Sequence, residues 1–555
     1  MPEKVVITIN EGKIRGVKEI SAHSKTPYYA FYGIPYAEPP VKNLRFKDPV
    51  KIKKWANIYD GAEEKKPGCI QISLLGNSED TLWGDEDCLF NNIFTAKLPC
   101  EGEPLRPVIV NIHGGSYNTG TPHTKHYGSP NFIMQHDVVY VNISYRLHIL
   151  GFLNLGLKEC SGNQGIKDIL MAFRWIKDNV ASFGGDSENI TLLGCSTGAA
   201  IIHLAMLTPA LDRNLFQKAV LMCGYFMNPI APHLEENKHH GVEVAKSMEY
   251  IGDPNDYKRV LNFLKKKPAM ELLEHVFSYQ SSVLNNVSPI TLLSVFSPTI
   301  EPDVIPRNPQ KLVHSIMRIP IMVGYCEREA ILGFLRGDMR KKTEEYSKTS
   351  FCQNCWGWGY NLNRDEIKLI NEKVVSFYTK GKSIENAPLT TKVDIQSDIC
   401  MSDLYDTLVD AIAVDPRSTV FMYSFEFEGV IGTLKEGRNI EEPIKGTFHG
   451  SEYCYWNCFF KSPHDKETRK MVDSFTKLVT TFAKTGDPNH KDLPVRWRPY
   501  TLEKPCYLRI NKSMEMAEGR LFEERLQFWN DIKQAISYSL IAREFLHLPF
   551  AYWVI

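Results

Sequence analysis

Apolar runs and helical patterns alternate through the middle of the chain. Residues 107–112, 138–144 and 190–193 are runs rich in Val, Ile and Leu. Such runs are typical of strands that are buried on both faces of a sheet. Between the second and third runs, residues 166–180 carry apolar side chains at helical spacing. This order of strand, helix and strand predicts a parallel βαβ unit.

The same pattern continues toward the C-terminus, with longer interruptions. Residues 219–223, 320–325 and 420–427 are further apolar runs that predict strands. Residues 230–315 and 333–412 show mixed polar and apolar helical patterns, so we expect mostly helical insertions that wall a pocket. The fold class predicted is therefore α/β, with a large, mostly parallel central sheet flanked by helices.

Length and linkers decide the domain organisation. A chain of 555 residues could hold several ordinary domains, but it shows no internal repeat and no low-complexity linker. We therefore predict one α/β domain over residues 1–535, and an apolar, aromatic C-terminal tail over residues 536–555.

The tail is too short to cross a membrane. Arg543 and Glu544 interrupt it, and the apolar remainder is far shorter than the roughly 20 residues that a span needs. Three roles remain open for this segment: packing on the domain, joining a partner, or peripheral contact at a membrane interface.

The net charge of the chain limits the classes of molecule that it is expected to bind. The 65 Lys and Arg residues balance the 65 Asp and Glu residues, so no strong net field indicates nucleic acid or an anionic membrane. An aromatic content of 11% suits a large core with apolar pockets. We expect a small, neutral molecule as the ligand, and the sequence predicts no oligomeric state.

The N-terminal residues and the cysteines bear on compartment and on metals. Residues 1–9 contain no apolar signal region, so we expect an intracellular, cytoplasmic protein with reduced thiols. Cys352-x-x-Cys355 lacks a second ligand pair at finger-like spacing. The sequence therefore predicts neither a metal site nor a cofactor.

A motif typical of serine hydrolases directly follows the apolar run at residues 190–193. Gly194-Cys195-Ser196-Thr197-Gly198 is a G-x-S-x-G string, and a good helix former follows from Ala199 onward. Small residues are needed in such an elbow because the turn is strained while the serine hydroxyl must project above the sheet. The helix also directs its N-terminal N–H groups at charge that develops beside Ser196.

A second glycine-rich turn, His113-Gly114-Gly115-Ser116, directly follows the 107–112 run. A tight turn is the simple interpretation. The turn lies two strands before the elbow, and this position favours a second interpretation, in which the loop supplies oxyanion donors.

An attacking serine also needs a base and a group that holds the base. Glu329 follows the strand predicted at 320–325, and His449 follows the strand predicted at 420–427. Because the carboxyl ends of parallel strands meet at one edge of the sheet, both side chains are expected beside Ser196.

Several further stretches together resemble one known family. The chain looks like a type-B carboxylesterase of the cholinesterase-like family, with the insect alpha-esterases as the nearest group, over about residues 5–530. The matching stretches are Gly33-Ile34-Pro35-Tyr36-Ala37, Glu86-Asp87-Cys88-Leu89, His113-Gly114-Gly115, Tyr145-Arg146-Leu147, Gly151-Phe152-Leu153, Gly162-Asn163-Gln164-Gly165, Phe183-Gly184-Gly185-Asp186 and Phe482-Ala483-Lys484-Thr485-Gly486-Asp487-Pro488.

The resemblance implies an α/β-hydrolase fold and a set of site residues. The family's nucleophile, acid and base fall on Ser196, Glu329 and His449. Its oxyanion donors fall on the backbone N–H groups of Gly115, Ser116 and Thr197.

Three residues at the nucleophile depart from the family pattern. Cys195 stands where the family usually has glutamate, Thr197 where it has alanine, and Ser116 where it has glycine. Loss of the glutamate removes an anion near His449, so we expect this histidine to ionise near or below its unperturbed pKa of about 6.5. The same loss weakens attraction for cations, so we do not expect cholinesterase-like specificity.

The resemblance also concerns two cysteines. Secreted members of the family close a disulfide onto the cysteine that matches Cys88, and Cys69 is the only nearby partner. Because no signal peptide is recognised, we expect both to be reduced.

Three functions are consistent with these residues. The favoured one is a serine hydrolase of neutral carboxylic esters, xenobiotic or lipid-derived, that acts through an acyl-enzyme. The alternative is a slow-turnover protein of the same fold that sequesters esters or organophosphates. A non-catalytic adhesion protein is the third, although such relatives typically lack the nucleophile and carry a signal and a membrane anchor.

Overall fold

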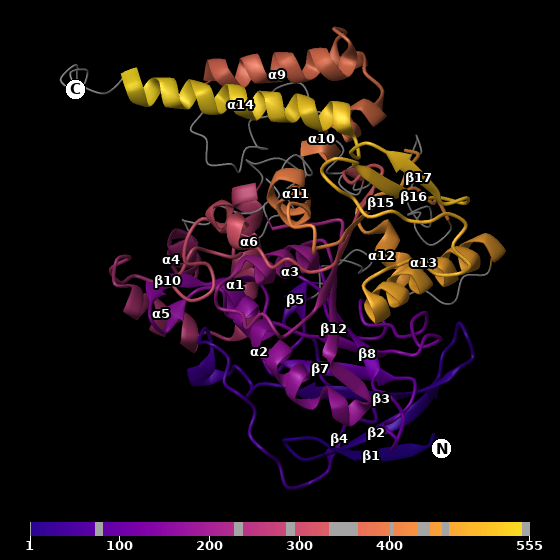
Figure 1. Ribbon diagram of the computed structural model, residues 1–555. Helices are drawn as coiled ribbons and strands as arrows, with labels where there is room; N and C mark the ends of the chain where they lie inside the picture. Colours follow the sequence, from indigo (N-terminus) through magenta and orange to yellow (C-terminus); the bar gives the residue numbers. More distant parts are fainter. Residues whose placement is uncertain are drawn as a thin grey trace, which may run out of the picture.

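One large twisted sheet runs through the molecule (Figure 1). The computed structural model describes residues 2–72, 82–226, 237–284, 295–331, 364–399, 404–429, 444–457 and 465–546. Within these ranges the sheet has 13 strands, in the order β1-β2-β3-β7-β9-β8-β12-β13-β14-β15-β16-β17, with β4 paired to β2. The strands are β1 (Lys4–Thr8), β2 (Lys13–Ile20), β3 (Pro27–Pro35), β4 (Tyr59–Asp60), β7 (Phe90–Thr95), β8 (Arg106–Ile112), β9 (Val139–Ile143), β12 (Gly185–Cys195), β13 (Lys218–Met222), β14 (Ile321–Cys326), β15 (Val420–Phe425), β16 (Cys506–Ile510) and β17 (Glu515–Glu518).

Parallel pairing is unbroken from β9 to β16. The flanking strands pair antiparallel, except that β4 pairs parallel with β2. β9, β13, β14 and β15 are buried along their whole length. This burial explains why their sequences read as continuous apolar runs rather than alternating ones. The α/β class and the mostly parallel sheet predicted from sequence are confirmed.

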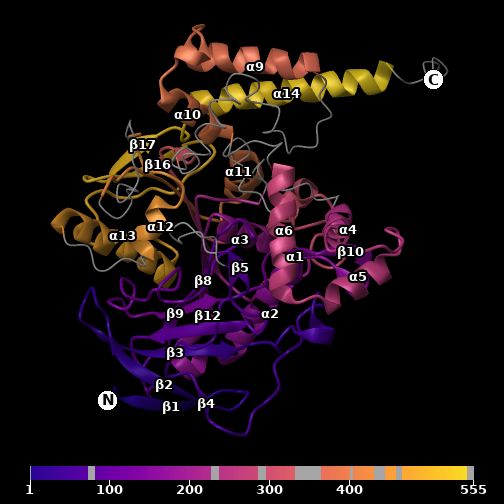
Figure 2. The same ribbon diagram turned by 180° about the vertical axis from the view of Figure 1, so that it is seen from behind.

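Helices cover both faces of the sheet, as two opposite views show (Figures 1 and 2). They are α1 (His148–Phe152), α2 (Gln164–Asn179), α3 (Thr197–Leu207), α4 (Asn237–Ser247), α5 (Tyr257–Lys266), α6 (Ala269–Leu284), α9 (Arg364–Thr379), α10 (Leu389–Ile399), α11 (Asp410–Ala413), α12 (Ser451–Trp456), α13 (Lys466–Thr485) and α14 (Glu523–Leu546). Two short hairpins lie outside the sheet, β5 (Gln71–Ile72) with β6 (Leu82–Trp83) and β10 (Asn154–Leu157) with β11 (Cys160–Ser161).

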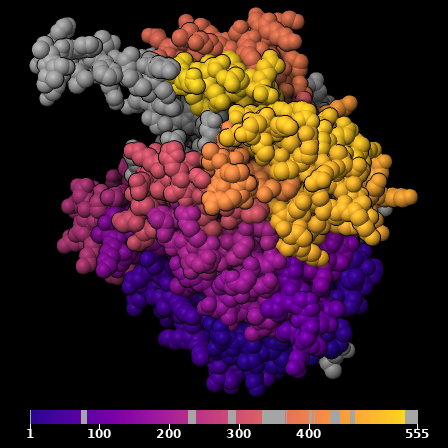
Figure 3. Space-filling view, viewed as in Figure 1, coloured from indigo at the N-terminus to yellow at the C-terminus, as the bar shows by residue number. Residues whose placement is uncertain are grey.

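The C-terminal helix spans the predicted boundary between the domain and the tail. The tail is predicted to begin at residue 536, which lies within α14, and this helix continues to Leu546. It lies beside α9 at one end of the molecule (Figure 3), where Phe528 stacks on Phe377 with ring centroids 4.1 Å apart. The apolar end, residues 547–555, lies outside the described residues. Among the helices that the structure does describe, none is long and apolar enough to cross a membrane.

A disulfide joins Cys69 to Cys88, which corrects the expectation that both are reduced. The fold brings their Cα atoms to 5.0 Å, a separation that a disulfide spans. The expectation was wrong because it rested on compartment alone and contained no geometry. Disulfides persist mainly in oxidising compartments, so the intracellular expectation loses the support of reduced thiols at this pair. Cys352 and Cys355 lie outside the described residues.

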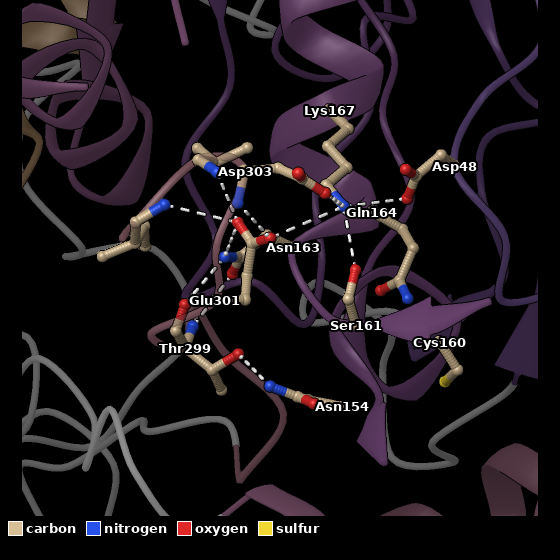
Figure 4. A network of polar contacts seen from close by, with 12 residues as sticks. Asp48, Asn154, Cys160, Ser161, Asn163, Gln164, Lys167, Thr299, Glu301 and Asp303 are labelled. Carbon is tan, nitrogen blue, oxygen red and sulfur yellow. Dashed lines mark hydrogen bonds and ion pairs between the residues drawn. The ribbon is translucent and has the colours of Figure 1, made fainter. Parts of the chain in front are cut away.

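A buried polar network fastens the segment after α6 to the start of α2 (Figure 4). The Glu301 carboxylate accepts the Asn163 side-chain N–H at 3.1 Å. Lys167 Nζ, one turn along α2, lies 2.9 Å from Asp48 and 3.3 Å from Asp303. Three segments distant in sequence are thereby held together.

A second buried ion pair, Arg146 with Asp168, fastens α2 to the loop that precedes α1. Arg146 donates from Nε at 2.8 Å and from Nη2 at 2.6 Å to the two carboxylate oxygens of Asp168. Both side chains are at most 3% exposed. Because water reaches neither group, each charge depends on the other.

We therefore expect Asp168→Asn to lower the free energy of unfolding by about 3–5 kcal/mol, since it leaves the Arg146 charge buried without a counter-ion. Urea unfolding followed by tryptophan fluorescence measures the change. Lys18→Met, which breaks the exposed Lys18–Glu3 pair, is the control and should cost at most about 1 kcal/mol. Equal losses in the two variants would contradict the importance assigned to the buried pair.

Candidate active site

Ser196 lies in a sharp turn between β12 and α3. Its backbone adopts φ 59° and ψ −127°, a conformation that a non-glycine residue rarely takes. The two flanking glycines are required by close contact. A Cβ on Gly194 would lie 2.5 Å from the carbonyl carbon of Gly198, and a Cβ on Gly198 would lie 2.1 Å from the Ile112 carbonyl oxygen. The turn is the nucleophile elbow that the sequence predicts, with Ser196 partly exposed at its tip.

Glu329 and His449 meet across the loops that follow β14 and β15. His449 Nδ1 lies 2.6 Å from Glu329 Oε2, and the other carboxylate oxygen accepts the Cys326 N–H at 2.7 Å. The His449 backbone N–H donates to the Glu329 carbonyl at 3.3 Å. Glu329 is thus fixed at both oxygens and holds the imidazole by one ring nitrogen.

The histidine loop is pinned to the glutamate loop at a second point. Thr447 Oγ1 accepts the Glu327 N–H at 2.9 Å, and the Thr447 carbonyl accepts the Arg328 N–H at 2.9 Å. Hydrogen bonds at Thr447 therefore join two backbone segments 120 residues apart.

The elbow lies next to this loop, although no hydrogen bond joins Ser196 to His449 among the described residues. A Cβ on Gly450 would lie 3.5 Å from Cys195 Sγ, so the residues beside the serine and beside the histidine are in contact. Serine–histidine hydrogen bonds are often long in unliganded sites and shorten when substrate binds.

The loop after β8 carries the expected oxyanion donors. Gly115 adopts φ 120°, and Ser116 and Tyr117 adopt φ 55° and 62°, so two non-glycine residues stand in the left-handed region. The Ser116 N–H donates to Thr197 Oγ1 at 3.1 Å. The Ser116 N–H, one of the expected oxyanion donors, is therefore already bonded to the Thr197 side chain. Thr197 is one of the three residues that depart from the family pattern.

Sequence reasoning missed a third acidic group, Glu452. It is fully buried near the start of α12 and accepts from the thiols of Cys223 and Cys326 at 2.7 and 2.8 Å. Burial, with Glu329 nearby, raises its pKa to about 7. The available signal was its position three residues after His449, but position alone does not distinguish a buried glutamate from an exposed one.

Glu452 also changes the expectation for His449. Burial acts to lower the pKa of His449, but the hydrogen bond and charge of Glu329, together with the charge of Glu452, outweigh it and raise the pKa above its ordinary value. The expected ionisation near or below 6.5 was wrong because it considered only the carboxylate lost at Cys195.

Comparison with known proteins places these features in one family. The profile of the carboxylesterase family matches residues 3–529. Esterase E4 of Myzus persicae is 27% identical over 94% of this chain and 93% of its own length. Juvenile hormone esterase of Tribolium castaneum is also 27% identical, over 92% of this chain and 88% of its own.

The fold has a solved counterpart. The crystal structure of juvenile hormone esterase from Manduca sexta, with OTFP covalently attached, superposes with a TM-score of 0.81 at 23% identity. The match covers 96% of this chain and all of that one. With a family profile along nearly its whole length and a nucleophile elbow in an α/β-hydrolase sheet, the chain belongs to the carboxylesterase family and is a carboxylic ester hydrolase.

Proposed function

We propose that this hydrolase cleaves neutral carboxylic esters through an acyl-enzyme formed on Ser196, with His449 as general base and Glu329 as the group that holds it. The observation that carries the proposal is the 2.6 Å contact between His449 Nδ1 and Glu329, beside the elbow that exposes Ser196. This contact keeps the Nδ1 proton on the glutamate side and leaves Nε2 as a proton acceptor.

The chemistry follows from these positions. His449 Nε2 takes the Ser196 proton as Oγ attacks the ester carbon, and the carbonyl oxygen becomes an oxyanion facing the N–H groups of Gly115, Ser116 and Thr197. Collapse expels the alcohol, which receives the proton from His449. A water molecule then repeats the sequence and releases the acid.

Neutral esters are the favoured substrates because the elbow lacks the family's usual carboxylate. Cys195 is a buried thiol whose pKa burial raises well above its ordinary value, so it offers no anion to a cationic substrate. Lipid-derived esters suit this environment, and two of the relatives described above are named juvenile hormone esterases.

A second candidate, slow-turnover sequestration of esters or organophosphates, is motivated by the Ser116–Thr197 hydrogen bond. A donor already bonded to Thr197 Oγ1 must exchange partners before it stabilises the oxyanion. Steady-state turnover after the acylation burst separates the two candidates.

The triad is tested by single and double substitutions. Ser196→Ala and His449→Ala should each lower kcat by on the order of 10⁴ or more, with the double variant little worse, because the residues act as one unit. An aryl ester assay and fluorophosphonate labelling give the measurements. His239→Ala, at an exposed histidine, is the matched control and should retain activity. Additive losses would refute the shared unit.

The pH profile tests the histidine. Because the base must be neutral and Glu329 and Glu452 raise its pKa, kcat/KM should rise with pH through one ionisation above about 6.5. Glu329→Gln removes the strongest raising influence, so the midpoint should shift to lower pH in addition to any loss of rate. The assay uses an ester without ionisable groups. A midpoint below 6.5 in the unsubstituted enzyme would reject the raised pKa.

Thr197 is tested by removing its hydroxyl. A neutral hydrogen bond is worth a net 0.5–1.5 kcal/mol, so freeing the Ser116 N–H in Thr197→Val should raise the acylation rate by up to about tenfold. Thr197→Ser keeps the hydroxyl and is the matched control. Pre-steady-state kinetics separates acylation from deacylation. A slower acylation in Thr197→Val would show that the hydroxyl assists the reaction.

A further inference from the structure

Two thiols and a carboxylate form a closed cluster behind the catalytic histidine. Cys223 directly follows β13, Cys326 ends β14, and Glu452 lies in α12; all three are at most 2% exposed. The two Sγ atoms are 3.5 Å apart, and each is within 2.8 Å of one Glu452 oxygen.

We propose that Cys223, Cys326 and Glu452 bind one thiophilic divalent cation, of which Zn²⁺ and Cd²⁺ are the chemical type. Thiolates with one oxygen ligand suit these ions, and the two thiol protons occupy the space that an ion would take. Binding releases both protons to solvent. The ion, two thiolates and the carboxylate then carry a net charge of −1.

The geometry needs little rearrangement. One ligand atom from each residue already lies within 4.8 Å of the others. Two sulfurs bound to zinc at about 2.3 Å stand roughly 3.8 Å apart at a tetrahedral angle, close to the 3.5 Å observed. The Cys223 N–H is bonded to Gly324 at 2.8 Å and the Cys326 N–H to Glu329 at 2.7 Å, so the sheet holds both cysteines in place.

The strand beside β13 ends in a third buried thiol, Cys195. Three buried thiols therefore stand at the ends of three adjacent parallel strands, and two of them contact the Glu452 carboxylate. The sequence did not predict this site because its ligands are separated by 103 and 126 residues and have no motif spacing.

Occupancy should inhibit the ester hydrolase reversibly. Cys223 Sγ also accepts the Gly450 N–H at 3.5 Å, and Gly450 follows His449. Ligand atoms of Cys223, Glu329 and His449 lie within 4.8 Å of one another. An ion bound to Cys223 therefore lies beside the catalytic base and blocks its proton transfer.

The binding test uses Cd²⁺ alone on the full chain. A Cys100→Ser/Cys352→Ser/Cys355→Ser background removes the exposed thiol and the sequence's C-x-x-C pair as other sources of binding. Equilibrium dialysis should find one Cd²⁺ per chain, with a cadmium–thiolate absorption band. An absence of bound Cd²⁺ in this background would overturn the site, and this result does not depend on esterase activity.

Ligand variants then locate the ion. In the same background, Cys326→Ser should weaken Cd²⁺ binding by about 10²-fold or more, because each ligand carries a large share of the binding free energy. Cys506→Ser, at a buried thiol elsewhere, is the matched control and should leave binding unchanged. Equal affinity in Cys326→Ser and Cys506→Ser would overturn the assignment.

Activity provides the last readout. Ester hydrolysis should fall in proportion to bound Cd²⁺ and return when EDTA removes it. Full activity at full occupancy would overturn the inhibitory role. Loss that EDTA does not restore would also count against a reversible site.

Discussion

Three backbones come into contact at the elbow, and the site depends on this contact. β8 and β12 are adjacent parallel strands, and the first turn of α3 touches both. A side chain at Gly198 would collide with the end of β8, which is also where the oxyanion loop begins. The proposed nucleophile and the proposed oxyanion donors are therefore fixed relative to each other by backbone rather than by flexible side chains. A side chain at Gly194 or Gly198 would break this contact. The three departures from the family pattern, Cys195, Thr197 and Ser116, leave the contact intact.

The sequence predicted much of this arrangement, for physical reasons. Strands buried on both faces lack alternation and are recognisable, and Glu329 and His449 could be assigned because each follows such a strand. Side-chain partners were not predictable. Nothing in local periodicity shows that Glu452 is buried, that Ser116 donates to Thr197, or that two cysteines from separate strands meet. Those contacts arise only when the sheet assembles.

The charge near His449 depends on residues that only the assembled fold brings together. Replacement of the family's glutamate by Cys195 removes a carboxylate on one side of His449. Glu452 supplies another, held by two thiol donors and shielded from water. In a site of low dielectric, a buried carboxylate acts on the imidazole strongly. The proposed base therefore has a pKa raised above its ordinary value, although the residue before Ser196 is a buried thiol and not a carboxylate.

The occupied donor in the oxyanion loop decides between turnover and sequestration. Ser116 cannot easily turn away from Thr197, because Asn118 and Thr119 both donate to the Gly115 carbonyl and keep the loop closed. The Thr197 side chain must therefore rotate away before the Ser116 N–H can bond to the oxyanion. An oxyanion is a charged acceptor, and hydrogen bonds to charged acceptors are roughly twice as strong as neutral ones. The developing oxyanion therefore wins the Ser116 N–H from the Thr197 hydroxyl, at a cost of about 0.5–1.5 kcal/mol. A cost of that size slows acylation without preventing it, which favours an ester hydrolase of restrained rate over a protein that only binds.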